Sequence, residues 1–252
     1  MAEPLYRGIV ESFKGVFRIL GMTLDVVGTD NIPASGGAIL AINHTSYLDF
    51  ALGGVPADMR GRRLVRFMAK DSVFKHPVAG PLMRGMKHIP VDREDGSQAF
   101  HVAVDAARRG ELIGVFPEAT MSRSLEIKEL KSGAVRMAQA AEVPLIPMIV
   151  FGGHRVLSYD VKDFTRGRTI CMTIGTPIES TATNDPDQET LALRSRLSEL
   201  LDETIARYPD KPQNAPWIPR RHGGSAPTLE EARAWEEERR ARRAADRGEK
   251  SA

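Results

Sequence analysis

The sequence predicts an α/β fold with a mixed, largely parallel central sheet flanked by helices, an N-terminal amphipathic helical element and a charged C-terminal tail. The first observation behind this prediction is that apolar segments of strand length alternate with segments of helical periodicity through the middle of the chain, as in proteins with parallel sheets. The second is composition. With 252 residues, 42% hydrophobic and 27% charged, the chain suits one globular domain with appendages.

The predicted elements follow one another without an internal repeat. We expect strands over residues 36–44, 63–70, 87–93, 111–119, 143–151 and 168–178. Helices are expected between and after them, over residues 77–85, 97–110, 132–142 and 187–208. Gly110 suits the position just past a helix, where a left-handed backbone conformation is common.

Residues 1–25 are predicted to form an amphipathic helix, because Leu5, Ile9 and Phe13 belong to a set of apolar residues at helical spacing, with basic residues among them. Two interpretations stay open: a helix packed on the domain, or a helix in a membrane interface. The charges that interrupt its apolar positions argue against a signal peptide. No apolar run reaches the roughly 18 to 20 residues of a membrane-spanning helix.

The main domain is predicted over residues 26–208, and an extended, charged tail over 209–252. Thr228 and Glu231 fit a capping box at the start of a charge-dense helix in this tail. The tail is either solvated or a basic surface element that contacts a membrane or a partner. One cysteine excludes an internal disulfide and suits a reducing compartment, and a net charge of +2 gives no indication of nucleic acid binding.

The segment "AINHTSYLDF", residues 41–50, ends an apolar run on polar residues. Five helical residues would place His44 and Asp49 about 140° apart, so they can meet only if His44 precedes a helix that Asp49 helps to begin. Thr45 or Ser46 would be the N-cap, and Ser46 with Asp49 matches a capping box. Asp49 is therefore either a cap beside a loop histidine or the acceptor that orients His44 as a general base.

A second polar cluster follows a later apolar strand, and its members are Pro117, Glu118, Thr120 and Arg123. In α/β sheets, ligands bind in the crevice at the carboxyl ends of strands. Glu118 and His44 would both occupy such ends. The alternative is an exposed glutamate in a turn.

Two basic residues occupy positions suited to an anion. Arg93 follows the strand over 87–93 and would offer a bidentate fork to phosphate. Lys131 precedes a helix start rich in small residues, where the dipole and the ammonium group both favour an anion. The alternative for each is an ordinary surface side chain.

In this order and spacing, the segments resemble the glycerolipid acyltransferases of the lysophosphatidic acid acyltransferase type (the 1-acyl-sn-glycerol-3-phosphate acyltransferase family), in a variant similar to actinobacterial members. The resemblance covers roughly residues 25 to 205. It rests on four blocks, which are His44-Thr45-Ser46-Tyr47-Leu48-Asp49, Ile89-Pro90-Val91-Asp92-Arg93, Phe116-Pro117-Glu118 and Val143-Pro144-Leu145-Ile146-Pro147.

The resemblance implies transfer of an acyl chain from acyl-CoA or acyl-ACP to a hydroxyl of lysophosphatidic acid, giving phosphatidic acid. It implies His44 as general base, Asp49 as its orienter, Arg93 as a phosphate contact, and Glu118 as a group that orders the acceptor pocket or binds a hydroxyl. No metal, no other cofactor and no covalent intermediate is implied. Backbone N–H groups near the helix after His44 would stabilise the oxyanion.

A lipid substrate favours the membrane interpretation of the N-terminal helix. We therefore expect a peripheral, monotopic protein on the cytoplasmic face of the cell membrane, attached to the inner leaflet.

The chain departs from the family at Met121, where an arginine is expected. Arg123 or Lys131 would substitute for it, and the acceptor stays open: glycerol 3-phosphate, or a lysophospholipid or glycolipid with a larger headgroup, are alternatives. Two rival classes are a hydrolase with Ser46 as nucleophile, for which no G-x-S-x-G motif exists, and a membrane-binding scaffold without activity.

Overall fold

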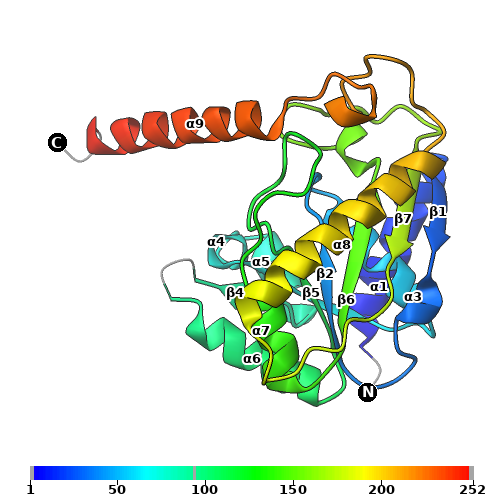
Figure 1. Cartoon of the computed structure of the whole chain (residues 1–252). Helices are drawn as coiled ribbons and strands as arrows, with labels where there is room; N and C mark the ends of the chain where they lie inside the picture. The colour runs from blue at the N-terminus through cyan, green and yellow to red at the C-terminus, as the bar shows by residue number, and fades with distance from the viewer. Residues whose placement is uncertain (1–2, 93–94, 250–252) are drawn as a thin grey trace.

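The computed structural model describes residues 3–92 and 95–249, and within them seven strands form one sheet in the order β1-β7-β6-β2-β5-β3-β4 (Figure 1). All neighbouring strands are parallel except β6 and β7. The mixed, largely parallel sheet is thus confirmed. The strands are β1 (Thr23–Val27), β2 (Ala38–Ile42), β3 (Val65–Lys70), β4 (Ile89–Val91), β5 (Leu112–Val115), β6 (Leu145–Phe151) and β7 (Thr169–Ile174).

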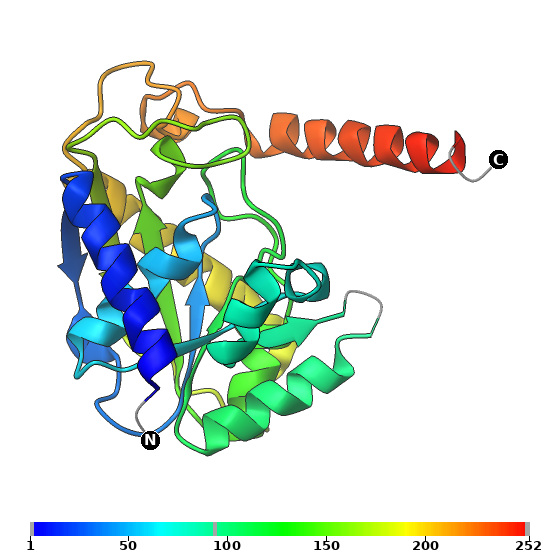
Figure 2. The same ribbon diagram turned by 180° about the vertical axis from the view of Figure 1, so that it is seen from behind.

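Helices cover both faces of the sheet (Figures 1 and 2). In the central strand β2, Ile39 and Ala41 pack into the core beneath α6, α7 and α8, whereas Leu40 and Ile42 pack into the core on the side of α1, α2 and α3. The helices are α1 (Pro4–Ile19), α2 (Asp49–Gly53), α3 (Val55–Met59), α4 (Asp71–Phe74), α5 (Ala79–Gly85), α6 (Ser97–Arg108), α7 (Gly133–Ala141), α8 (Pro186–Arg207) and α9 (Leu229–Glu249).

The N-terminal helix is shorter than the sequence predicts. It ends at Ile19, Gly21 follows with a φ of 59°, and residues 23–27 form β1, which pairs with β7. The prediction of helical structure through residue 25 is wrong there, because the backbone of residues 23–27 has its hydrogen-bond partners on β7 instead. The short helices α3 and α4 also have no counterpart among the predicted elements.

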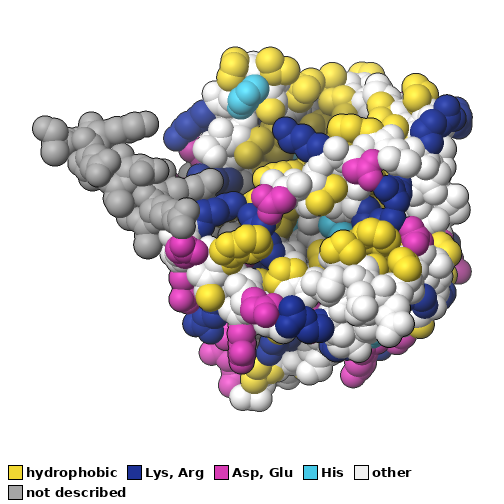
Figure 3. Space-filling view, turned by 90° about the horizontal axis from the view of Figure 1, so that it is seen from above, with side chains coloured by type: hydrophobic (Ala, Val, Ile, Leu, Met, Phe, Trp, Pro, Cys, Tyr) yellow, Lys and Arg dark blue, Asp and Glu magenta, His cyan; other side chains and the backbone are white. Residues whose placement is uncertain are grey.

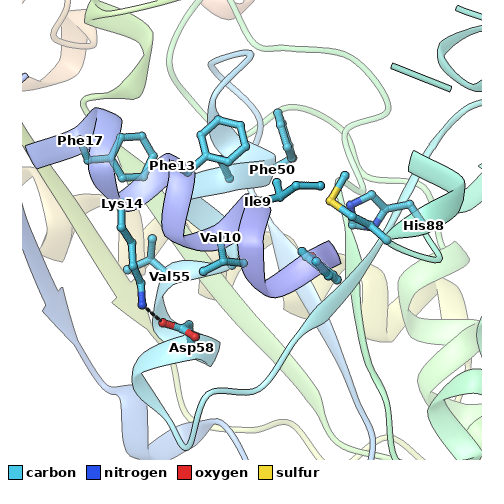
Figure 4. Close-up of a pocket in the computed structure, with 13 residues that line it drawn as sticks. Ile9, Val10, Phe13, Lys14, Phe17, Phe50, Val55, Asp58 and His88 are labelled. Carbon is cyan, nitrogen blue, oxygen red and sulfur yellow. Dashed lines mark ion pairs between the residues drawn. The ribbon is translucent and has the colours of Figure 1, made fainter. Parts of the chain in front are cut away.

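One face of α1 packs on the domain (Figure 4). Tyr6 and Phe17 are buried, and Lys14 forms an ion pair with Asp58 of α3. Between α1 and the helices α2 and α3 lies a cavity of only ≈ 40 Å³. The first interpretation of this segment, a helix packed on the domain, therefore describes this face.

A second face of α1 is exposed and also carries apolar residues. Leu5, Val16 and Ile19 are exposed, Ile19 by 70%. At ~100° per residue they share one side of the helix, roughly 120° from the side of Tyr6 and Phe17. The packing of α1 on the domain thus leaves apolar surface that the membrane interpretation requires.

The segment after α8 packs on the domain. Ala215 and Ile218 join the core beneath α8, and the carbonyl of Trp217 lies 3.0 Å from Nε2 of His154, in the loop after β6. The predicted capping box forms, since Thr228 Oγ1 accepts from Glu231 N at 3.2 Å and Glu231 accepts from Thr228 N at 2.8 Å. The solvated-tail interpretation is therefore wrong for the buried part of this segment, which includes Ala215, Ile218 and Ala226, and α9 then projects from the body (Figure 1).

Within residues 3–92 and 95–249, no helix combines the length and the hydropathy needed to cross a bilayer.

Candidate active site

The first and third sequence blocks meet at one end of the sheet. β2 and β5 are parallel neighbours, so the loops that follow them leave the sheet on the same side. Ser122 N, in the loop after β5, donates to the carbonyl of His44 at 2.7 Å. Figure 3 looks onto this end of the molecule and shows apolar and basic side chains interspersed across it.

His44 and Asp49 are in contact. His44 Nδ1 lies 3.0 Å from Asp49 Oδ2, and the same oxygen accepts from the N–H groups of Thr45 and Ser46 at 2.7 Å each. The carboxylate is fully buried as the first residue of α2. Burial raises the pKa of Asp49, and the contacts with His44 and the two N–H groups oppose this effect by favouring the charged form.

The imidazole of His44 is held in one orientation. Its ring stacks on Phe116 with 4.4 Å between ring centroids, and its side chain is 23% exposed. Because the carboxylate of Asp49 can only accept, Nδ1 carries the proton in the neutral ring and Nε2 is left as a base. This is the geometry that general-base catalysis requires.

The helix cap differs from the prediction. α2 begins at Asp49, not after Thr45 or Ser46, and Ser46 Oγ accepts from Leu48 N at 3.0 Å rather than from Asp49 N. Of the two hydrogen bonds of a capping box, only the one from Ser46 N to the Asp49 carboxylate forms. The Ser46 hydroxyl donates to Leu157 O at 2.7 Å, so it is not paired with His44 and the hydrolase alternative fails.

The backbone N–H groups at this helix start bear on the predicted oxyanion site. Every backbone N–H from His44 to Asp49 already has an acceptor within the protein. The N–H of His44 donates to the Glu118 carboxylate, and those of Thr45 and Ser46 donate to the Asp49 carboxylate. The N–H groups of Tyr47, Leu48 and Asp49 donate to Leu157 O, Ser46 Oγ and Ser46 O respectively. An N–H group that donates to the protein is not available for a developing negative charge. The N–H groups of residues 44–49 are therefore committed to the protein, and an oxyanion site at other N–H groups near this helix stays a prediction.

Glu118 joins two loops through their backbones. Its Oε1 accepts from His44 N at 2.9 Å and its Oε2 from Lys128 N at 3.1 Å. The side chain is buried, which excludes the alternative of an exposed glutamate in a turn. Pro117 is buried as well, and its carbonyl accepts from Lys131 N at 2.9 Å. Glu118 thus positions the backbone of the general-base candidate.

Comparison with known proteins identifies the family. A family model described as "Acyltransferase" matches residues 23–151, just over half of the chain. The chain belongs to the acyltransferase family. The prediction of an O-acyltransferase is confirmed, and the alternative of a non-enzymatic scaffold loses its basis.

Named relatives of this acyltransferase agree with the family assignment. A "1-acyl-sn-glycerol-3-phosphate acyltransferase" of Bacillus subtilis is 27% identical over 212 residues, which are 82% of this chain and 98% of the relative. A "probable" enzyme of the same name from Mycoplasma pneumoniae is 28% identical over 78% of this chain and 79% of its own length. The crystal structure of the 1-acyl-sn-glycerophosphate (LPA) acyltransferase PlsC from Thermotoga maritima shares the fold, with a TM-score of 0.66 at 20% identity over 81% of each chain.

Three basic residues were predicted to bind the acceptor, and the structure describes two of them, Arg123 and Lys131. Arg93 lies outside the described residues. Lys131 is exposed, whereas Arg123 pairs with Asp160 and lies over the rings of Tyr159 and Trp235. A substrate contact for any of them stays a prediction.

Lys128 lies closer to the third block and was missed by sequence reasoning. Its Nζ lies 2.5 Å from Thr120 Oγ1 and 3.2 Å from a carboxylate oxygen of Glu236 in α9. No linear pattern reveals this, because the loop turns back on itself at Leu125, which has a φ of 62°. Met121, at the family's arginine position, is buried. Among the described residues, no group of acidic, histidine or cysteine side chains could hold a metal ion.

The buried Glu118 carboxylate predicts a pH effect on stability. Burial raises its pKa from 4.5 to about 7, although the N–H groups of His44 and Lys128 oppose this. Because the pKa of Glu118 is higher in the folded than in the unfolded protein, its contribution to the free energy of unfolding is fully present below pH 4.5. This contribution is lost as the pH rises through 7, which lowers the free energy of unfolding by about 3 kcal/mol. Urea unfolding of wild type and Glu118→Gln between pH 4.5 and 8 measures it. The free energy of unfolding should fall more steeply in wild type, and parallel curves would contradict the prediction.

Proposed function

We propose that this acyltransferase transfers a fatty acyl chain from acyl-CoA or acyl-ACP to the hydroxyl of lysophosphatidic acid, with His44 as general base. The observation that carries the proposal is the 3.0 Å contact between His44 Nδ1 and a buried Asp49 carboxylate, which leaves Nε2 as the proton acceptor. The acceptor and the reaction are supported by the name of the Bacillus subtilis relative, of which the chain covers 98%.

The reaction needs one proton acceptor and no enzyme-bound acyl group. Nε2 of His44 takes the proton of the acceptor hydroxyl as its oxygen attacks the thioester carbonyl. The carbon–sulfur bond breaks, the acyl chain is esterified, and the thiolate takes the proton back from His44. Asp49 stabilises the imidazolium that exists between the two transfers.

The acceptor's phosphate needs a cation near the site. Arg93, two residues beyond β4, is the proposed phosphate contact. The ammonium group of Lys128, which lies beside Thr120, is a second candidate. It would supply the positive charge that the family's arginine, absent here because position 121 is Met121, would otherwise provide. Glu118 acts on neither substrate in this proposal, because both of its oxygens accept backbone N–H groups. It is a positioning residue.

A lipid acceptor also requires access to a bilayer. We propose that α1 lies at the membrane surface with Leu5, Val16 and Ile19 towards the lipid, since these residues form an apolar face that the domain does not cover. In the cell this surface is the cytoplasmic face of the membrane. Sedimentation with vesicles containing anionic lipid tests the attachment, and Val16→Asp with Ile19→Asp should abolish it.

The test of the function is thiol release from palmitoyl-CoA by purified protein with lysophosphatidic acid in detergent, beside His44→Ala. Acceptor-dependent release that yields phosphatidic acid, and that the substitution abolishes, is the expected result. Glycerol 3-phosphate and lysophospholipids with larger headgroups serve as competing acceptors in parallel reactions. A preference for one of these would replace lysophosphatidic acid as the acceptor, and no release with any of them would refute the function.

A further inference from the structure

The helix α5 has an exposed apolar side, and it lies on the same side of the sheet as α1 (Figure 2). Val78, the residue that precedes α5, is 68% exposed, and Leu82 is 41% exposed. Leu82 and Gly85 follow Val78 by four and seven residues, so at ~100° per residue all three lie on one side of the helix. Gly80, on the opposite side, is buried. The domain therefore leaves the apolar side of α5 uncovered.

This side of α5 meets the exposed apolar face of α1. A methyl group on Gly85 would lie only 2.3 Å from Leu5 Cδ2, so Leu5 packs directly on the bare backbone of α5. Leu5 is the first residue of the exposed face of α1 that also contains Val16 and Ile19. The two helices thus form one continuous apolar surface, with its members Leu5, Val16, Ile19, Val78 and Leu82. An exposed apolar surface of this kind marks a site of interaction.

Basic residues accompany the α5 part of this surface. Residues 70–88 contain four lysine or arginine residues and one acidic residue, Asp71, whereas the net charge of the whole chain is only +2. Lys75 pairs with Asp71 and Lys87 with Glu3, and both lysine side chains are more than half exposed. Apolar side chains with basic residues around them complement the acyl chains and the anionic headgroups of a bilayer surface.

The apolar surface is on the side of the sheet that carries the general-base candidate. Phe116, which stacks on His44, packs against the core on the side of α1. β3 and β5 are parallel neighbours, so α4 follows β3 at the same end of the sheet where the loop with Glu118 follows β5. Val73 of α4 is exposed as well. The chain from β3 to α5 therefore leads from the active-site end to the apolar surface.

We propose that α5 is a second membrane-binding element, which inserts Val78 and Leu82 into an anionic lipid surface beside α1. A single helix on a bilayer can roll about its own axis. Two helices that touch at Leu5 and Gly85 fix the rotation of the domain, and they turn the side that carries His44 towards the lipid. The inference rests on the proposed function for its lipid acceptor and goes beyond the attachment through α1.

Insertion is measured first with a dye at single positions. Cys171 is the only cysteine of the chain and is buried, so a cysteine introduced at the surface reacts selectively. Leu82→Cys, Ile19→Cys and, on the far side of the sheet, Leu191→Cys each receive a nitrobenzoxadiazole group. With vesicles of phosphatidylcholine and phosphatidylglycerol, the emission should rise and shift to the blue at positions 82 and 19, and stay unchanged at position 191.

Two patterns of dye response would overturn the proposal. A response at position 19 without one at position 82 would restrict the contact to α1. An equal response at position 191 would show insertion that does not select this side of the molecule.

Substitutions then measure the contribution of α5. Val78→Asp with Leu82→Asp should lower the vesicle partition coefficient at least about tenfold in sedimentation. The matched control is Val102→Asp with Leu191→Asp, which replaces the same two residue types, also exposed, on α6 and α8. It adds the same charge and should change the coefficient less than about twofold. Equal losses would reflect charge alone, and no loss in the first variant would exclude α5, so either result refutes the proposal.

The lipid composition tests the anionic partner. Vesicles of phosphatidylcholine alone should bind at least about tenfold more weakly, and equal binding would exclude the role of the basic residues. A response at position 82 to rising protein concentration without vesicles would instead assign the surface to a second copy of the chain.

None of these measurements requires turnover. Vesicle insertion by a protein that transfers no acyl chain in detergent would refute the proposed function alone. Acyl transfer in detergent by a protein whose position 82 stays in water would refute this inference alone.

Discussion

Replacing His44 with alanine is expected to lower kcat/KM by about 10²- to 10⁴-fold, the range attributed to a positioned general base. The imidazole is the group that Asp49 orients at 3.0 Å and that Phe116 holds by stacking. The loss should fall on kcat, since the side chain has no proposed role in substrate binding. Steady-state thiol release with saturating acceptor measures it.

The control for His44→Ala is stability, because the ring also packs on Phe116. Thermal unfolding should show a folded protein with a melting temperature close to that of wild type. Near-normal turnover in a folded His44→Ala protein would mean that His44 is a loop histidine and that the mechanism is wrong.

The substitution of Asp49 by asparagine is expected to lower kcat about 100-fold while leaving stability close to that of wild type. The asparagine oxygen can take the place of Asp49 Oδ2 and accept from Thr45 N and Ser46 N. The NH₂ group would then take the place of Asp49 Oδ1, which makes no hydrogen bond in wild type. The charge that stabilises the imidazolium is lost. Because burial raises the pKa of Asp49, removing the charge does not by itself weaken the fold.

Asp49→Ala is the matched variant that separates catalysis from capping. It leaves the N–H groups of Thr45 and Ser46 buried without acceptors, at a cost of about 2 to 4 kcal/mol. Both variants should lose activity, but only Asp49→Ala should lose this stability in urea unfolding. Wild-type turnover in Asp49→Asn would reduce Asp49 to a capping residue.

Much of the fold was predictable from local patterns. The positions of β2, β3, β5 and β6 follow from apolar segments of strand length, and α6 ends where Gly110 adopts a φ of 90°. β1 was not predicted. Three of its five residues are apolar, namely Leu24, Val26 and Val27, but the predicted N-terminal helix extended into this segment. The hydrogen-bond partners that make it a strand lie on β7, which is distant in the sequence.

The contact between His44 and Asp49 was predictable from local sequence as well. His44 and Asp49 are five residues apart, and the turn that brings them together involves only the backbone between them. Their spacing and the polar residues at a strand end therefore contained the information. The hydrogen-bond partners of the N–H groups in this turn were not contained in it, because they include Glu118 and Leu157 from distant loops.

By itself, the sequence determined the alternation of strands and helices, the local pair of His44 and Asp49, and the order of the blocks. The tertiary structure decided that Glu118 joins residues 44 and 128, that Lys128 lies beside Thr120, and that the segment after α8 packs against His154. The physical reason is that these contacts depend on the order of strands in the sheet and on the paths of long loops. Burial and hydrogen-bond partners arise from that packing, and no spacing of residues along one chain specifies them.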